Sequence, residues 1–371
     1  MVSATKQYFF VGSYASAHYP GIFSLAFDTE SGELTDMQSF KGVECPSFLV
    51  VHPNGRWLYA VSETGNGDLN LSGSVWAFDI NQDSMDIRPI NRQSTQGDWP
   101  CHAVLDRTGR WLATTNYGTG NAAIFPILSD GRLGRLTALV QHAGAGPVSS
   151  RQEGPHAHSA VFTPDNLYLI VADLGIDQLI IYRFDTDAGT LTNHAQVQSN
   201  PGAGPRHFAF HPNGHILFVA NELDNSVTVY RYDAVGALTP LQSLNTLPVN
   251  DPTSSVADIH ISNAGDRLYV SNRGHNSIAV FNVEEDGNLT PLGHPSCGGN
   301  WPRNFVLDPS GKFMLVANLR TNSVSVLPVN SNNAELGTTI SQVTVLEPAC
   351  IAFQLQKTID GSQIESSATA L

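Results

Sequence analysis

The sequence has few cysteines and no long hydrophobic run. Its four cysteines are far apart and lack the spacing of a metal site, which excludes a disulfide framework and a cysteine-bound metal. Free thiols are typical of cytoplasmic proteins. Residues 1–7 are polar, and the apolar run at residues 8–11 is too short for a signal peptide or a membrane span. We therefore expect a cytoplasmic protein with no membrane partner.

Charged residues are also scarce, at 14% of the chain, and basic ones are in the minority. The chain has 19 Lys and Arg against 33 Asp and Glu, which gives a net charge of −14. A nucleic-acid-binding protein normally presents a basic face, so we expect no nucleic-acid partner. The negative field would also repel an anionic ligand, and an anion site must therefore gather its arginines locally.

A short segment recurs along the whole chain. Each copy has a tight turn, usually with Pro, Gly or Asn, followed by a strand of β-branched and aromatic residues. The copies cover residues 52–63, 106–117, 163–174, 211–222, 262–273 and 308–319. A short apolar strand precedes each copy and two further strands follow it, so each repeat of roughly 50 residues predicts four short antiparallel strands.

Such sheets cannot bury both faces alone, and radial stacking solves that problem. Residues 8–14 resemble the second strand of a repeat without its first, and the missing strand stands at residues 348–353. The sequence therefore predicts an all-β, seven-bladed β-propeller of four-stranded antiparallel blades, closed by pairing the N- and C-terminal strands in one blade. A single domain over residues 7–356 is expected, with a polar, disordered tail at 357–371. A β-sandwich array is the alternative.

The repeats can be aligned with one another to find the positions around the central channel. The residues that follow the second strands are Tyr14, Glu63, Tyr117, Leu174, Glu222, Arg273 and Leu319. The residues that begin the first strands are Ser47, Cys101, His158, Arg206, Ala257, Arg303 and Ala349. If both sets point to one channel mouth, His158, Arg206, Glu222, Arg273 and Arg303 cluster there. His207, His156 and His102 are neighbours in the same alignment.

Three arginines in one place suit the bidentate capture of a carboxylate or phosphate. A carboxylate and an imidazole beside them could act as general base and acid, and the sequence does not decide between Glu222 and His158. Glu222 could instead be a structural ion-pair partner of Arg206 or Arg273. The pair His156 and His158 has the spacing of metal ligands on one strand face, but no third ligand matches, so we expect no metal.

The motifs at 154–158, 204–207, 220–222 and 271–273 resemble the lactonase family of seven-bladed propellers. That family includes bacterial 6-phosphogluconolactonase and fungal carboxy-cis,cis-muconate cyclase, and the similarity covers residues 7–356. The resemblance implies a catalytic group of one His, two Arg and one Glu. Those positions match His158, Arg206 and Glu222, with Arg273 as the best second arginine and Arg303 as its competitor.

The resemblance therefore implies hydrolysis of 6-phosphogluconolactone to 6-phosphogluconate, a step of the pentose phosphate pathway. Glu222 or His158 would activate water, Arg206 would stabilise the oxyanion, and Arg273 and Arg303 would hold the phosphate. His207, His156 and His102 would assist in substrate binding. No cofactor is expected, and the protein would be a monomer or weak homo-oligomer.

Three rival functions fit the same scaffold. The first is a lactonising or lactone-hydrolysing enzyme for a carboxymuconate-type substrate. The second is a non-enzymatic propeller that serves as a binding platform, and the third is a metal-dependent sugar lactonase. Activity on muconates, apolar patches on the outer loops and sensitivity to chelators, respectively, would favour them.

Overall fold

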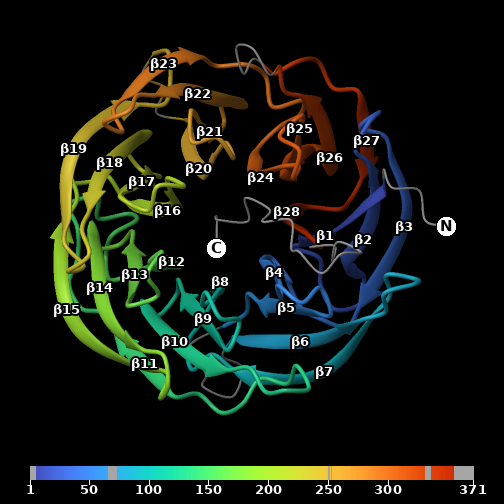
Figure 1. The fold of residues 1–371 in the computed structure, drawn as a ribbon, viewed down its shortest axis with the longest axis horizontal. Coiled ribbons are helices and arrows are strands. Elements are labelled where there is room, and N and C mark those ends of the chain that lie inside the picture. Colours follow the sequence, from blue (N-terminus) through green and yellow to red (C-terminus); the bar gives the residue numbers. More distant parts are fainter. Residues whose placement is uncertain (1–5, 66–72, 250, 252, 331–335, 355–371) are drawn as a thin grey trace.

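The computed structural model describes residues 6–65, 73–249, 251, 253–330 and 336–354. In this part of the chain, seven four-stranded antiparallel sheets stand around a central channel like the blades of a propeller (Figure 1). The predicted all-β, seven-bladed fold is therefore confirmed. The described residues form no α-helix, and their one helical turn is the 3-10 helix η1 (Leu319–Thr321).

Each blade contributes one strand to the channel and three more toward the rim. The channel strands are β4 (Leu49–Val51), β8 (Pro100–Leu105), β12 (Ala157–Phe162), β16 (Pro205–Phe210), β20 (Ser255–Ile261), β24 (Pro302–Leu307) and β28 (Pro348–Phe353). The second strands are β1 (Lys6–Ser13), β5 (Trp57–Ser62), β9 (Trp111–Asn116), β13 (Tyr168–Asp173), β17 (Ile216–Asn221), β21 (Arg267–Arg273) and β25 (Phe313–Asn318).

The third and fourth strands complete each sheet. The third strands are β2 (Pro20–Asp28), β6 (Ser74–Ile80), β10 (Asn121–Pro126), β14 (Gln178–Asp185), β18 (Ser226–Tyr232), β22 (Ser277–Val283) and β26 (Ser323–Pro328). The fourth strands are β3 (Leu34–Lys41), β7 (Ile87–Ser94), β11 (Ala138–Gln141), β15 (Thr190–Gln198), β19 (Leu238–Asn245), β23 (Leu289–Gly293) and β27 (Ser341–Thr344).

The turn between first and second strands shows why the repeat folds in this way. In the turn between β8 and β9, the Asp106 carboxylate accepts hydrogen bonds from the backbone N–H of Thr108 (3.1 Å) and of Trp111 (2.9 Å). Gly109 adopts a φ of 68°, a conformation that is costly for other residues. His52 and His211, in equivalent turns, contact the backbone carbonyls of Gly109 and Gly265 in the next blade. The repeated turn thus also joins neighbouring blades.

The ring closes where the two ends of the chain meet. Strand β28 pairs antiparallel with β1, with Phe9 opposite Phe353 and Val11 opposite Ile351, so one blade has the order β28-β1-β2-β3. The rings of Phe9 and Phe353 lie 5.5 Å apart between centroids. The predicted closure is confirmed, while the predicted tail at 357–371 lies outside the described residues.

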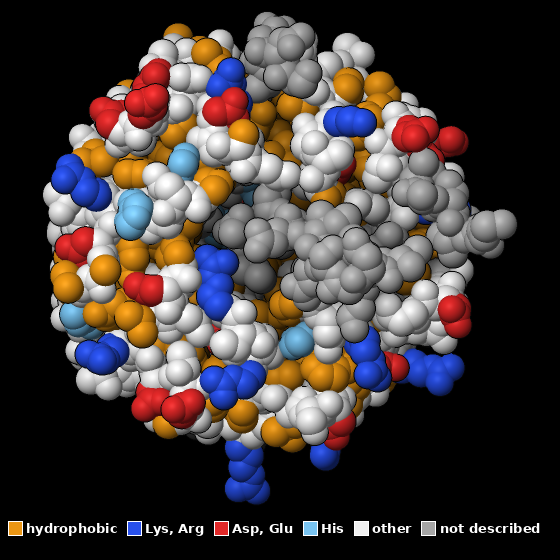
Figure 2. All heavy atoms as spheres, viewed as in Figure 1, with side chains coloured by type: hydrophobic (Ala, Val, Ile, Leu, Met, Phe, Trp, Pro, Cys, Tyr) orange, Lys and Arg blue, Asp and Glu red, His pale blue; other side chains and the backbone are white. Residues whose placement is uncertain are grey.

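The hydrophobic core lies between the blades rather than in the channel. Strands β5, β9, β13, β17 and β25 are buried along their whole length, whereas outer strands such as β15 alternate between exposed and half-buried residues. Charged side chains lie mostly toward the rim of the face shown in Figure 2. Among the described residues, no helix has the length and hydropathy needed to span a membrane.

Candidate active site

β-bulges place side chains at one mouth of the channel. In the blade formed by β16, β17, β18 and β19, the pairing of β16 with β17 shifts between Pro205 and His207, so Arg206 is the extra residue of a bulge. The pairings of β8, β12 and β24 shift in the same way around Cys101, His158 and Arg303. A bulge re-aims the extra side chain, and bulges are common beside active sites. The repeated bulge therefore explains why the first-strand positions converge.

Glu222, which follows β17, is the centre of this mouth. Its Oε2 accepts contacts from Arg206 Nε at 2.9 Å and Arg273 Nη2 at 3.0 Å, while its Oε1 lies 2.7 Å from Arg151 Nη2. Burial alone would raise the pKa of this carboxyl, but Arg273, Arg206 and Arg151 together hold the pKa well below its usual range. Glu222 is therefore ionised and committed to arginines, which makes it a poor acceptor for a proton from water.

The arginines keep unused hydrogen-bond donors. Arg206, buried, donates from Nη1 to the carbonyl of Ala257, and Arg273 donates from Nη2 to the carbonyl of Val256 at 2.8 Å. Among the described residues, Arg206 Nη2 and Arg273 Nη1 have no hydrogen-bond partner. Burial and the neighbouring charge of Arg273 lower the pKa of Arg206 to about 10, which shows that the cations repel one another.

Arg303 differs from the two buried arginines, because although burial opposes the shift, Tyr14 and Glu63 raise its pKa. Its guanidinium lies 4.9 Å from the ring centroid of Tyr14, and within the described part of the chain it makes no hydrogen bond or ion pair. The nearby carboxyl of Glu63 accepts hydrogen bonds from Tyr14 Oη (3.0 Å) and Ser47 Oγ. Burial raises the pKa of Glu63, although Arg303 opposes the shift. An anion that enters the channel therefore meets donors that are already in place.

His158 lies beside this cluster as a neutral imidazole. Burial and the charge of Arg206 lower its pKa well below the usual range. Its ring lies 5.7 Å from that of Tyr117 and 5.3 Å from that of His207. The thiol of Cys101 is 3.9 Å from His158 Nδ1, but burial raises the pKa of Cys101 to about 12, so the sulfur is not a thiolate nucleophile.

Sequence reasoning missed Arg151. This residue lies in the connection between β11 and β12, the longest link between successive blades, and its Nη2 also donates to Tyr117 Oη at 3.3 Å. The internal alignment considered only strand ends, where blades are equivalent, and this loop has no counterpart in the other blades. An arginine in the longest connection between blades is the signal that could have found it.

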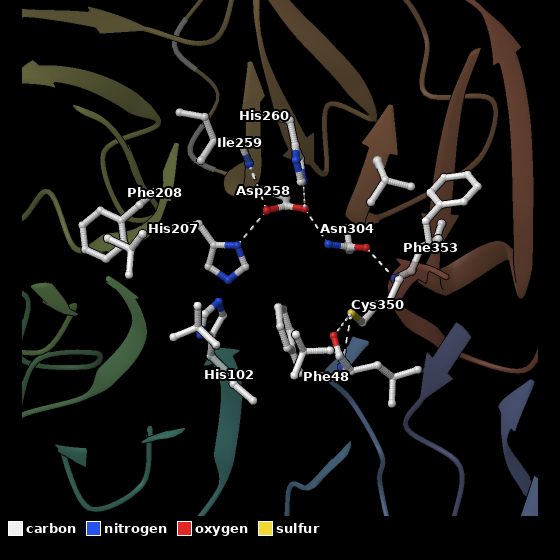
Figure 3. A pocket seen from close by; sticks show the side chains of 18 of the residues that line it. Phe48, His102, His207, Phe208, Asp258, Ile259, His260, Asn304, Cys350 and Phe353 are labelled. Carbon is white, nitrogen blue, oxygen red and sulfur yellow. Dashed lines mark hydrogen bonds and ion pairs between the residues drawn. The ribbon is translucent and has the colours of Figure 1, made fainter. Parts of the chain in front are cut away.

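The three neighbouring histidines occupy two different places. His156 stacks on Tyr117, with ring centroids 4.4 Å apart, and contacts the Tyr117 carbonyl through Nδ1. His102 and His207 instead line a cavity of about 160 Å³ farther along the channel (Figure 3). In the described part of the chain, no three His, Cys, Asp or Glu residues are arranged to hold a metal ion.

Asp258 organises the wall of this second cavity. Its carboxylate accepts hydrogen bonds from His207 Nδ1 (2.7 Å), His260 Nε2 (3.0 Å) and the amide of Asn304, which surround it in Figure 3. The backbone N–H groups of Ile259 and Phe305 also donate to it. Although burial opposes the shift, His260 and His207 hold the pKa of Asp258 well below its usual range. The alignment named Ala257, which occupies the position of Arg206, and did not consider Asp258, which follows it as His207 follows Arg206.

Comparison with known proteins gives the same fold and indicates lactone hydrolysis. The family model described as "Lactonase, 7-bladed beta-propeller" matches residues 8–353. The chain belongs to this lactonase family. The predicted resemblance is thereby confirmed, and with it the prediction of a hydrolase of the lactonase type. The family assignment also favours an enzyme over a binding platform.

Three similar proteins illustrate the relationship. The chain is 35% identical to 6-phosphogluconolactonase of Bacillus subtilis (strain 168), and the match covers 94% of this chain and 99% of the relative. It is 36% identical to 6-phosphogluconolactonase of Formosa agariphila, covering 85% and 91%. The solved periplasmic gluconolactonase of Pseudomonas aeruginosa superposes with a TM-score of 0.88 at 29% identity, covering 94% and 99%. Because this last relative is periplasmic, the cytoplasmic location of our lactonase stays a prediction.

Proposed function

We propose that the protein hydrolyses a phosphorylated sugar lactone, 6-phosphogluconolactone, to 6-phosphogluconate. The observation that carries the proposal is the set of unused guanidinium donors on Arg206, Arg273 and Arg303 around one channel mouth. Arginine in such a buried setting binds phosphate or carboxylate through charge-assisted, often bidentate, hydrogen bonds. The relatives named 6-phosphogluconolactonase support the choice of substrate.

The chemistry follows from the protonation states. Neutral His158 accepts a proton as water adds to the lactone carbonyl carbon, and Arg206 Nη2 stabilises the negative oxygen that forms. The ring C–O bond then breaks, and the ring oxygen leaves as a hydroxyl after it takes the proton from His158. The new carboxylic acid releases its own proton to solvent. No redox step or co-reactant other than water is needed.

Glu222 has a different role in this scheme. Because its two oxygens are occupied by arginines, it positions Arg206 and Arg273 rather than acting as the base. His158 is buried beside the same cluster and carries no charge to neutralise, which favours it as the base. A base of low pKa is a modest catalyst, but sugar lactones already open in water and need only a modest acceleration.

The test is hydrolysis of freshly prepared 6-phosphogluconolactone, followed by proton release and corrected for spontaneous opening. We expect the wild type to accelerate opening and His158→Gln to lose about a hundredfold or more, the contribution expected of a general base. A wild type no faster than buffer would contradict the proposal. Since arginines also capture carboxylates, carboxymuconolactone and its open-chain muconate are the next substrates to test.

A further inference from the structure

Arg151 differs from the other arginines at the mouth in its exposure. Its side chain is 41% exposed, whereas those of Arg206 and Arg273 are 2% and 7% exposed. It contacts Oε1 of Glu222, while the two buried arginines share Oε2. Arg151 is thus the outermost member of the cluster and reaches the carboxylate from the solvent side.

The backbone beneath Arg151 is held firmly. The N–H of Arg151 donates to the carbonyl of Val148 at 2.8 Å. The next residue, Gln152, is buried and donates from its amide to Asp177 (2.7 Å) and to the carbonyl of Leu174 (2.8 Å). The loop is therefore anchored, and only the long side chain of Arg151 needs to move to reach a new partner.

The ion pair between Arg151 and Glu222 is replaceable. Without it, Glu222 still has Arg206 at 2.9 Å and Arg273 at 3.0 Å, so its charge stays compensated. Arg151 also repels Arg273, because both are cations at the same mouth. A bound dianion would relieve this repulsion and offer Arg151 a second partner of higher charge than the carboxylate.

The shape of the substrate matches this arrangement. In 6-phosphogluconolactone, the carbonyl carbon and the phosphate lie at opposite ends of the molecule. If the carbonyl lies beside buried Arg206 and His158, the phosphate extends toward the exposed end of the mouth, where Arg151 lies. An unphosphorylated gluconolactone has only a hydroxyl at that end.

We propose that Arg151 determines specificity: its side chain leaves Oε1 of Glu222 and binds the phosphate of the substrate, which distinguishes phosphorylated from unphosphorylated sugar lactones. This inference rests on the proposed function. When Arg151 moves, Glu222 keeps its ion pairs with Arg206 and Arg273 and continues to position them.

The test compares two lactones in the full-length protein. For Arg151→Ala, we expect kcat/KM for 6-phosphogluconolactone to fall about tenfold or more, mainly through KM, as for the loss of one charge-assisted phosphate contact. For glucono-δ-lactone, we expect a change below about threefold, because this substrate lacks the phosphate. As a second measurement, inhibition by 6-phosphogluconate should weaken in the variant, while inhibition by gluconate should not.

Arg132→Ala is the matched control. Arg132 pairs with Asp130 at 2.7 Å and is 55% exposed, so it resembles Arg151 in both respects, but it lies in the link between β10 and β11 away from the mouth. Arg132→Ala should leave kcat/KM unchanged for both lactones. Equal changes for both lactones, or no change in Arg151→Ala, would overturn the inference and leave the proposed function standing. A wild type inactive on the phosphorylated lactone would instead remove the proposed function, and the inference with it.

Discussion

The mouth of the central channel and the cavity farther along it each hold a buried carboxylate, and they stabilise it in different ways. Glu222 is surrounded by three guanidiniums, which remain charged at any relevant pH. Asp258 is surrounded by imidazole, amide and backbone N–H donors. In both cases the pKa of the carboxyl falls despite burial.

The difference lies in the donors that are left over. Around Asp258 each of these donors is used in a hydrogen bond to the carboxylate. Around Glu222 the cations exceed the carboxylate, and several N–H groups have no partner among the described residues. We therefore expect the cluster around Asp258 to stabilise the fold and the cluster around Glu222 to bind an anion. Buried charge is therefore informative about function only when its partners are counted.

The largest expected effect is on stability and concerns Asp258. Asp258→Ala leaves His207, His260 and Asn304 without their acceptor, and we expect the free energy of unfolding to fall by about 3–5 kcal/mol, as for other broken buried charge clusters. Denaturant unfolding measures this loss. The kcat/KM of the folded variant should fall by less than about tenfold, since no substrate contact is removed. A stable variant that is inactive would break the comparison.

The second effect is on activity and concerns Glu222 and Arg206 at the channel mouth. Glu222→Gln removes the charge that orients Arg206 and Arg273, and Arg206→Ala removes the proposed oxyanion donor. We expect Arg206→Ala to lower kcat/KM by about a hundredfold or more, the magnitude typical for losing such a donor, and Glu222→Gln to lower it similarly by displacing the same donor. Steady-state hydrolysis of the phosphorylated lactone measures it. Near-wild-type rates in either variant would show that the chemistry occurs elsewhere.

The third effect is a pH dependence of stability. Burial and the charge of Arg206 lower the pKa of His207 to about 4. Between pH 6.5 and 4 this imidazole is therefore protonated in the unfolded chain but not in the folded protein. The contribution of His207 to the free energy of unfolding should therefore be full above pH 6.5. Between pH 6.5 and 4 it should fall by about 1.4 kcal/mol per pH unit. Denaturant midpoints across this range test it. His207→Gln should reduce the slope, and an unchanged slope would contradict the assignment.

The smallest expected effect concerns Arg303. Because Arg303 makes no hydrogen bond or ion pair with the described residues, Arg303→Ala should raise KM for the phosphorylated lactone about tenfold without lowering the free energy of unfolding. Kinetics and denaturant unfolding of the same preparation test both parts. A clear loss of stability would mean that Arg303 stabilises the fold, as the residues around Asp258 do.

The blades could be predicted because the sequence repeats. Turn residues and apolar strands recur at equivalent positions, so an error in one copy is corrected by the others. The same alignment indicated His158, Arg206, Glu222, Arg273 and Arg303, since all lie at equivalent strand ends. The structure brings His158, Arg206, Glu222 and Arg273 close together, and Arg303 lies near them.

Features that break the repeat could not be predicted in this way. Arg151 lies in a loop that only one connection possesses, so alignment offers nothing to compare it with. Asp258 occupies the same position of the repeat as His102 and His207, and it was missed because only the histidines at that position were considered. His102 and His207 were expected at the mouth, but each follows a bulged residue and lines the cavity farther along the channel.

The closing blade has a consequence for synthesis of the protein. Strand β28 pairs with β1 across nearly the whole length of the polypeptide, so a nascent chain cannot complete the ring until residue 353 has left the ribosome. Until then, the edge of β1 is open to pairing with other chains. Strand β28, the last strand among the described residues, thus ends the period in which the edge of β1 is exposed.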